Sequence, residues 1–283
     1  MAQPSSTHAP IKLLVADVDG TLVAPDKTLT AATVSAVRQL AAAGIRFAVV
    51  SGRPPRGMTM LIDPLELGTP LAAFNGGLIV DADLNPVQQH VLPADLVAPI
   101  IEELRGHDLD VWLYRGQDWF VDDLDAPHVS RESQTVQFDP QLAASYDDLT
   151  DDVAKIVGVS DDPAAVKRAG ESVRARYGHS ISAAASQAYY VDVTHPEANK
   201  GAVVRYLADR YHIPLAQIAT IGDMANDVLM FAHVGLSIAM GNASAEVKRA
   251  ARCVTASNEE EGFAEAVHRF VLPAAAPSTP TDR

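Results

Sequence analysis

The chain has 283 residues, of which 48% are hydrophobic and 20% charged, a composition typical of a globular protein. This length is enough for a full hydrophobic core and a second, smaller domain. The formal net charge of −14 argues against nucleic acid as a partner, because an acidic surface repels the phosphate backbone.

No apolar run reaches the roughly 20 residues that a membrane-spanning helix needs, and the first ten residues lack the apolar segment of a signal peptide. The single cysteine, Cys253, cannot form an internal disulfide, which is consistent with a reducing compartment. The sequence therefore predicts a cytoplasmic protein without a membrane partner. Residues 1–10 and 273–283, rich in Pro, Ala, Ser and Thr, are expected to be disordered tails.

The first part of the chain alternates between predicted strands and helices. A Val-rich apolar run at 11–18 predicts a buried parallel strand. Residues 30–43 have apolar side chains at helical spacing, with Thr30 as the expected N-cap. Short strands are predicted at 47–50 and 71–74, with a helical segment between them. This alternation favours βαβ units and a parallel sheet.

The same rhythm returns near residue 190. Strands are predicted at 189–193, 218–221 and 236–239, a helix at 199–211, and a second helix from about Ala225.

The region between these two blocks has a different texture, with short strands and helices mixed together. The predicted fold class is therefore α/β. We expect a Rossmann-like, doubly wound parallel sheet formed by 11–83 and 189–272, with an α+β cap domain inserted at 84–188.

Four short polar motifs lie where predicted strands end. Ligands of open α/β sheets bind at the carboxyl ends of the strands, so these motifs are expected to converge on one site. They are Asp17-Val18-Asp19-Gly20-Thr21, Ser51-Gly52-Arg53, Asn199-Lys200-Gly201 and Gly222-Asp223-Met224-Ala225-Asn226-Asp227.

The first motif places two carboxylates, Asp17 and Asp19, one residue apart at a strand end. Like charges repel, and a bound cation relieves that repulsion. Mg²⁺ takes such oxygen ligands together with phosphate and water, and a carboxylate can also attack phosphorus. The simpler alternative is an Asp-Gly turn after a core strand.

The second and third motifs contain groups that bind anions. Ser51 and the backbone of Gly52 precede a helical segment and could hold phosphate oxygens, although Ser51 could also be a plain N-cap. Lys200 could neutralise a phosphoryl oxygen, although an isolated lysine is more often an ordinary surface residue.

The fourth motif follows the strand predicted at 218–221. Asp223 could supply another metal ligand. Asn226 and Asp227 could instead stabilise a helix N-terminus. Each simple alternative is reasonable alone, but all four together, in this order, are improbable.

In combination, these motifs resemble the four signature motifs of the haloacid dehalogenase superfamily. The position of the α+β insertion, between the second and third motifs, is similar to that of the Cof-type subgroup (subclass IIB). The resemblance extends over nearly all of 11–270 and includes FNGGLIV at 74–80 and NEEEG at 258–262. Ser51 replaces the threonine that is more common in the second motif and keeps its hydroxyl.

The resemblance implies a Mg²⁺-dependent phosphatase that hydrolyses phosphate monoesters of small metabolites, such as sugar phosphates, through an aspartyl-phosphate. Asp17 would be the nucleophile, and Asp19 the general acid and base. The implied Mg²⁺ ligands are Asp17, the backbone carbonyl of Asp19, and Asp223. Phosphoryl oxygens would be bound by Ser51, Gly52, Lys200 and Asn226, and Asp227 would orient Lys200 or a metal-bound water.

The cap is expected to determine which substrate is accepted. Asn75 resembles the asparagine of the subgroup's Asn-Gly motif and is a candidate substrate contact. His128 and Arg131 are candidates to bind a second anionic group of the substrate. Trp112 and Trp119 are expected to fill the small core of the cap.

Two other functions remain open from the sequence. A phosphosugar mutase would use the same first motif, and a non-catalytic module could bind a phosphorylated ligand, although all the residues needed for catalysis are present. A dinucleotide-binding protein or a P-loop NTPase is disfavoured, since neither GxGxxG nor GxxxxGK[ST] occurs at the required place. Neither the physiological substrate nor the oligomeric state follows from the sequence.

Overall fold

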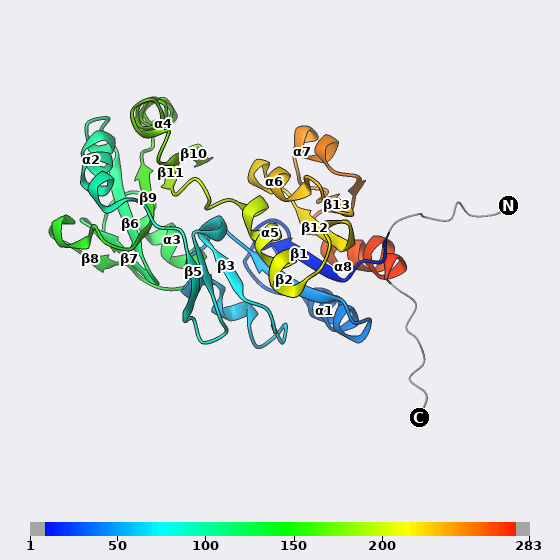
Figure 1. Ribbon diagram of the computed structural model, residues 1–283. Coiled ribbons are helices and arrows are strands. Elements are labelled where there is room, and N and C mark those ends of the chain that lie inside the picture. Colours follow the sequence, from blue (N-terminus) through cyan, green and yellow to red (C-terminus); the bar gives the residue numbers. More distant parts are fainter. Residues whose placement is uncertain (1–8, 276–283) are drawn as a thin grey trace. The chain divides into compact units, whose positions relative to one another are not determined.

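The structure, a computed structural model, describes residues 9–275 (Figure 1). Contacts divide these residues into two compact units. The first comprises 9–51, 60–71 and 199–275, and the second comprises 52–59 and 72–198. Within 9–275, no helix combines the length and the apolar character needed to cross a membrane.

The predicted tails 1–10 and 273–283 lie largely outside the described residues. The exceptions are 9–10, which form no helix or strand, and 273–275, where the expectation of disorder is wrong. A short 3₁₀ helix at Leu272–Ala274 continues the C-terminal helical segment, and the backbone N–H of Ile11 donates to the carbonyl of Ala274 at 2.8 Å. This backbone pairing with Ile11 orders residues 273–275.

The first unit is built on five parallel strands. Their order is β14 (Cys253–Val254), β13 (Leu236–Ala239), β12 (Ile218–Gly222), β1 (Leu13–Asp17) and β2 (Arg46–Val50). Every residue of the central strand β1 is buried, as expected of an apolar run with both faces covered. The predicted α/β fold class is confirmed.

Helices flank this sheet, and those predicted at 30–43 and 199–211 begin as expected, whereas the helix predicted from about Ala225 begins at Val228. In α1 (Ala31–Ala42), the Thr30 side chain accepts a hydrogen bond from the N–H of Thr33. In α5 (Lys200–Tyr211), the Asn199 side chain caps the first turn through the N–H of Ala202. Helix α1 packs on α8 (Gly262–Ala266), and α5 packs on α6 (Val228–Phe231). A further helix, α7 (Ala245–Ala250), follows β13.

The second unit contains a six-stranded sheet with mostly antiparallel pairing. Its strand order is β10 (Ser182–Gln187), β11 (Tyr190–Thr194), β9 (Val153–Val159), β6 (Asp110–Arg115), β7 (Asp118–Val121) and β8 (Gln141–Leu142). An apolar core joins this sheet to α2 (Ala94–Arg105) and α4 (Pro163–Tyr177). Trp112 and Trp119 are fully buried, as predicted.

Shorter elements complete the second unit. Helix α3 (Val129–Val136) follows β7, and β4 (Leu78–Val80) pairs antiparallel with β5 (Pro86–Gln89). Strand β3 spans Leu71–Ala73, and the chain passes from the first unit to the second after Leu71.

One predicted strand was assigned to the wrong sheet. The sequence predicts 189–193 as part of the core sheet, but β11 pairs with β9 and β10, and the second unit runs to Ala198. Val191 and Val193 face the apolar core of this unit, whereas Asp192 between them does not. Such alternation suits a sheet with one face packed on helices, not a core strand buried on both faces.

Candidate active site

The strand register brings three of the motifs to one edge of the parallel sheet. Asp17, the last residue of β1, pairs with Val50, so Ser51 follows at the same level. Ala16 pairs with Ile221, which places Gly222 and Asp223 beside Asp17. The carboxyl ends of β1, β2 and β12 therefore carry the polar residues, as predicted.

Lys200 reaches the same place from the first turn of α5. Its ammonium donates to Oδ1 of Asp17 and to Oδ1 of Asp227, at 2.5 Å in both cases. All three side chains are buried, with 2%, 7% and 0% exposure for Lys200, Asp17 and Asp227. One cation thus stands between two carboxylates in a site that excludes most water.

Burial and neighbouring charges together shift the pKa values of Asp17 and Lys200. Burial raises the pKa of Asp17 well above its ordinary value, with repulsion from Asp227 and Asp223 adding to the rise and the Lys200 ammonium opposing it. Burial disfavours the charge of Lys200, but attraction to Asp17 and Asp227 outweighs it and raises the pKa of Lys200. Lys200 therefore remains an ammonium ion.

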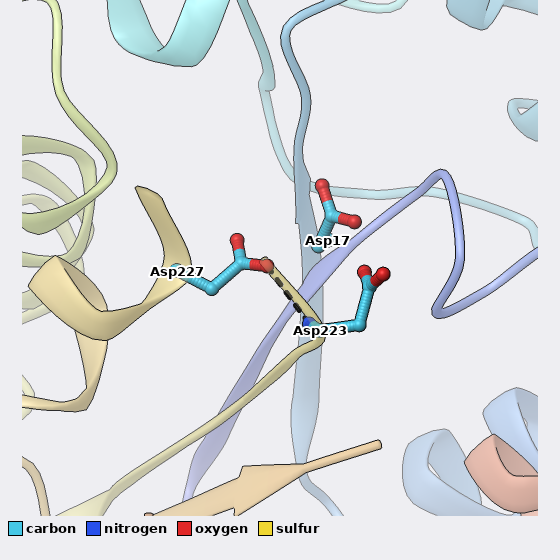
Figure 2. Close-up of side chains that lie close together, drawn as sticks. All are labelled: Asp17, Asp223 and Asp227. Carbon is cyan, nitrogen blue, oxygen red and sulfur yellow. Dashed lines mark hydrogen bonds between the residues drawn. The ribbon is translucent and has the colours of Figure 1, made fainter. Parts of the chain in front are cut away.

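Asp227 is held firmly by the backbone of its own loop. Its Oδ2 accepts from the N–H of Asp223 at 2.9 Å (Figure 2) and from the N–H of Met224 at 2.8 Å. Gly222 has no side chain here, and a Cβ at this position would collide with the Asp227 carboxyl group. Both Asp227 oxygens therefore accept from N–H groups, Oδ1 from the Lys200 ammonium and Oδ2 from the backbone.

Asp223 lies next to Asp17 with hydrogen bonds to both of its oxygens. Thr21 Oγ1 donates to Oδ1 at 3.1 Å, and Asn242 Nδ2 donates to Oδ2 at 3.2 Å. Burial, followed by repulsion from Asp227, raises the pKa of Asp223 to about 6. Because the negative charge of Asp223 is unfavourable here, a nearby cation would stabilise its ionised form.

The carboxylates of Asp17, Asp223 and Asp227 converge, with one oxygen from each lying within 4.8 Å of the others (Figure 2). Buried oxygen donors in excess of positive charge fit a hard divalent cation such as Mg²⁺. Asp223 fits as a ligand better than Asp227, because each Asp223 oxygen accepts one hydrogen bond, whereas Asp227 Oδ2 accepts from two backbone N–H groups and its Oδ1 accepts from Lys200.

The raised pKa of Asp223 has a measurable consequence for the metal-free protein. The ordinary pKa is 3.8 and the folded value is about 6, so the folded state binds this proton more tightly than the unfolded chain. The resulting stabilisation is complete below about pH 4 and is lost as the pH rises through about 6. In EDTA, urea unfolding should show wild type losing stability relative to Asp223→Asn over this range. If the stability of the wild type relative to Asp223→Asn stayed constant or rose with pH, the raised pKa of Asp223 would be contradicted.

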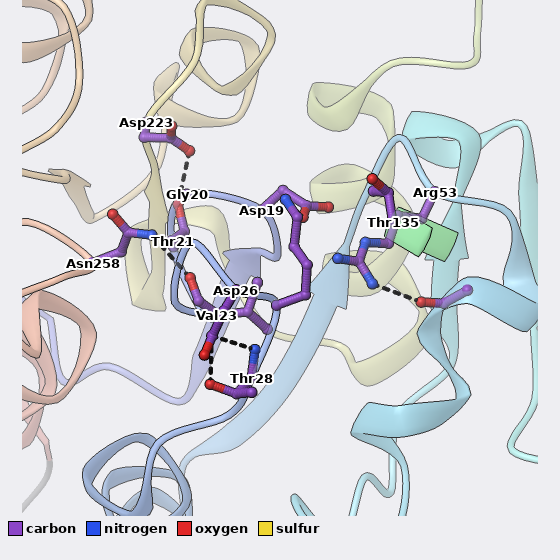
Figure 3. Close-up of polar contacts among 12 residues, drawn as sticks. Asp19, Gly20, Thr21, Val23, Asp26, Thr28, Arg53, Thr135, Asp223 and Asn258 are labelled. Carbon is purple, nitrogen blue, oxygen red and sulfur yellow. Dashed lines mark hydrogen bonds and ion pairs between the residues drawn. The ribbon is translucent and has the colours of Figure 1, made fainter. Parts of the chain in front are cut away.

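Asp19 points to a different partner. Its Oδ1 accepts from the Lys27 ammonium at 2.7 Å, and both side chains are about one-third exposed. The Asp26 carboxylate accepts from the N–H of Thr28, and Lys27 itself adopts a left-handed conformation, with φ of 69°. This tight turn, with Asp26 and Thr28 labelled in Figure 3, returns Lys27 to the first motif.

The remaining predicted phosphate-binding residues occupy different environments. Ser51 is buried at the end of β2, and Asn226 is exposed on the short 3₁₀ turn Ala225–Asp227. In the second unit, Asn75 lies beside Gly52, where an added Cβ would be 3.7 Å from the Asn75 amide. The structure therefore brings Asn75 to the second motif.

The two cap candidates meet on one tyrosine. The His128 ring stacks on Tyr189 with 4.2 Å between centroids, and the Arg131 guanidinium lies 5.2 Å from the centre of the same ring. His128 also contacts the Asp161 carboxylate at 2.8 Å. They form a cluster within the second unit, and their role as substrate contacts stays a prediction.

Four residues near the motifs escaped the sequence analysis, which gave them no role: Thr21, Lys27, Asn242 and Asn258. Asn242 follows the end of β13, the neighbour of β12, so the strand-end argument could have found it. Asn258 belongs to the NEEEG segment, and its amide donates to the carbonyl of Val23 at 3.0 Å (Figure 3). Nothing in the sequence pattern reveals the pairing of Lys27 with Asp19.

Comparison with known proteins agrees with this geometry. The family model of haloacid dehalogenase-like hydrolases matches residues 14–267. A 5-amino-6-(5-phospho-D-ribitylamino)uracil phosphatase of Bacillus subtilis is 26% identical, with 91% of this chain and 97% of the relative covered. An HMP-PP phosphatase of Yersinia pestis is 27% identical, with coverage of 92% and 95%.

A solved structure shows the same architecture. The crystal structure of a haloacid dehalogenase-like hydrolase from Bacteroides thetaiotaomicron is 28% identical and superposes with a TM-score of 0.83, covering 92% of this chain and 99% of that one. The residues matched by the family model, 14–267, include all four motifs. The chain therefore belongs to the haloacid dehalogenase-like hydrolases and is an enzyme of that family.

Proposed function

We propose that the chain is a Mg²⁺-dependent phosphatase that hydrolyses phosphate monoesters of small metabolites through an aspartyl-phosphate on Asp17. The observation that carries this proposal is the buried Asp17 carboxylate, 2.5 Å from the Lys200 ammonium and beside Asp223. Phosphoryl transfer depends on positioning and on neutralisation of charge, and this arrangement offers both around one nucleophile.

In the first step, an oxygen of Asp17 forms a bond to phosphorus while the bond from phosphorus to the leaving alcohol breaks. Asp19 donates a proton to the departing oxygen. In the second step, water attacks phosphorus, Asp19 takes its proton, and the bond between Asp17 and phosphorus breaks to release inorganic phosphate.

Other residues hold the phosphoryl group during both steps. We assign its oxygens to the hydroxyl of Ser51, the N–H of Gly52, the ammonium of Lys200 and the amide of Asn226. Mg²⁺ would be held by Asp17, Asp223 and the backbone carbonyl of Asp19. When bound, it reduces the repulsion between the phosphoryl group and the carboxylates.

The names of the relatives support a small phosphorylated metabolite as substrate, since two of them act on a phosphorylated ribitylamino-uracil and on HMP-PP. We extend this to a sugar phosphate or a related phosphate monoester. A cytoplasmic location remains part of the same proposal.

The direct test is phosphate release from a panel of sugar phosphates, flavin mononucleotide, pyridoxal phosphate and nucleoside monophosphates. We expect release by the wild-type protein with Mg²⁺, and none in EDTA until Mg²⁺ is restored. Release that is indifferent to EDTA would contradict the Mg²⁺ assignment. Absence of release from every compound, together with phosphoryl transfer between sugar positions, would show a mutase.

The role of Asp19 predicts a dependence on the leaving group. General acid catalysis contributes about 10²- to 10⁴-fold, but p-nitrophenolate leaves without a proton. We expect Asp19→Asn to lower kcat/KM by about 100-fold or more for an alkyl phosphate, and much less for p-nitrophenyl phosphate.

Lys27→Met should shift the same ratio in the same direction by a smaller amount, because its ammonium positions the Asp19 carboxylate. Lys167→Met is the matched control, since Lys167 is an exposed lysine near the Glu171 carboxylate in α4. Equal losses on both substrates would argue against proton donation by Asp19.

A further inference from the structure

Asn242 follows β13 by three residues and lies outside the four motifs. We infer that Asn242 is a positioning residue for the Mg²⁺ site, acting through Asp223 and through the loop that carries Asp19 and Gly20. This inference rests on the Mg²⁺ dependence proposed above. It assigns a further residue whose hydrogen bonds orient the metal ligands before Mg²⁺ binds.

The Asn242 amide joins two loops that carry the metal ligands. Its Nδ2 donates to the carbonyl of Gly20 at 2.9 Å, in the loop after β1, and to Oδ2 of Asp223 at 3.2 Å, after β12. A single amide nitrogen therefore sets the separation between these loops. Ligands already at the required separation bind a metal more tightly than ligands that must be brought together.

The orientation of this amide is also determined by its surroundings. The N–H of Asn258 donates to Asn242 Oδ1 at 3.2 Å. If the amide were reversed, its oxygen would face two acceptors and its nitrogen would face a donor. The Asn258 side chain in turn donates to Val23 in the first loop (Figure 3).

The Asp223 carboxylate is consequently held from both sides, by Thr21 at Oδ1 and by Asn242 at Oδ2. Gly20 makes this arrangement possible. It has φ of +81°, and a Cβ at that position would collide with the carboxylate. Hydrogen bonds of this kind orient a ligand before the metal arrives, and removing one typically weakens metal binding by about 10- to 100-fold.

The test is calorimetric titration of the metal-free proteins with MgCl₂ alone. We expect Asn242→Ala to raise the Kd for Mg²⁺ by about tenfold or more relative to wild type. Asn85→Ala is the matched control, because the Asn85 amide makes the same kind of bond, to Asp81 Oδ2 at 3.2 Å, on an exposed turn of the second unit. Its Kd should equal that of wild type.

A second variant distinguishes weaker metal binding from misfolding of Asn242→Ala. Thr21→Val removes the hydrogen bond to the other oxygen of the same carboxylate and preserves the side-chain shape, and it should also raise the Kd. In assays, activity lost by Asn242→Ala at limiting Mg²⁺ should return at saturating Mg²⁺, with KM for the phosphate ester unchanged. Damage unrelated to the metal would not be corrected by adding Mg²⁺.

Wild-type affinity in both Asn242→Ala and Thr21→Val would overturn the inference, as would a loss of activity that saturating Mg²⁺ does not restore. Failure of the wild-type protein to bind Mg²⁺ is a separate outcome. It would overturn the proposed metal dependence itself, and the positioning role with it.

Discussion

Asp17→Asn is expected to lower kcat/KM for phosphate monoesters by at least about a thousandfold, because an amide is a poor nucleophile and loss of a catalytic nucleophile is among the largest single effects in enzymes. The fold should persist, since asparagine has the same shape and Lys200 keeps its contact with Asp227. Burial disfavours the Asp17 charge and Lys200 stays paired with Asp227, so this substitution should cost less stability than the loss of Lys200.

The measurement is steady-state phosphate release, with circular dichroism to verify folding. Asp151→Asn, the same substitution at an exposed residue of the second unit, should match wild type. A folded Asp17→Asn protein that retains more than about a tenth of wild-type activity would rule out Asp17 as the nucleophile.

Lys200→Met should produce the largest loss of stability among the variants of the site. It removes the ammonium that lies between Asp17 and Asp227 and leaves two buried carboxylates facing each other. Removing one partner of a buried ion pair typically costs about 3–5 kcal/mol in the free energy of unfolding. Urea unfolding near neutral pH, in EDTA, measures this loss.

Two comparisons identify the cause of that loss. Lys167→Met should change stability by less than about 0.5 kcal/mol, since its ion pair is exposed. Adding Asp227→Asn to Lys200→Met should recover part of the loss, because one of the two unpaired charges disappears. A loss in Lys200→Met no greater than in Lys167→Met would mean that the buried ion pairs contribute little.

The sequence was sufficient to predict the core sheet and the convergence of its motifs, because local pattern carries that information. A continuous apolar run followed by polar residues defines β1 and Asp17, and a capping residue before an apolar helix defines α5. The third motif is expected to follow a strand of the core sheet. Instead, it follows β11, a strand of the six-stranded sheet, and Lys200 reaches Asp17 from the first turn of α5.

Other features of the site depend on contacts between residues far apart in the sequence. Asn242 and Gly20 are separated by 222 positions, and Thr21 and Asp223 by 202. Neither pairing produces a periodic pattern from which it could be predicted in the sequence. The hydrogen bonds of Asp227 to Lys200 and to the backbone of its own loop could not be read from the sequence either, and they favour a role in orienting Lys200.

The most direct test of the account is to find where the phosphoryl group resides during turnover. The protein would be mixed with a phosphate ester and Mg²⁺, quenched with acid within milliseconds, digested, and examined by mass spectrometry. We expect a transient phosphoryl group on Asp17 in the peptide that contains it, and none in Asp17→Asn. Rapid phosphate release by the wild type with the phosphoryl group on another residue, or with no phosphorylated peptide at any time, would contradict it.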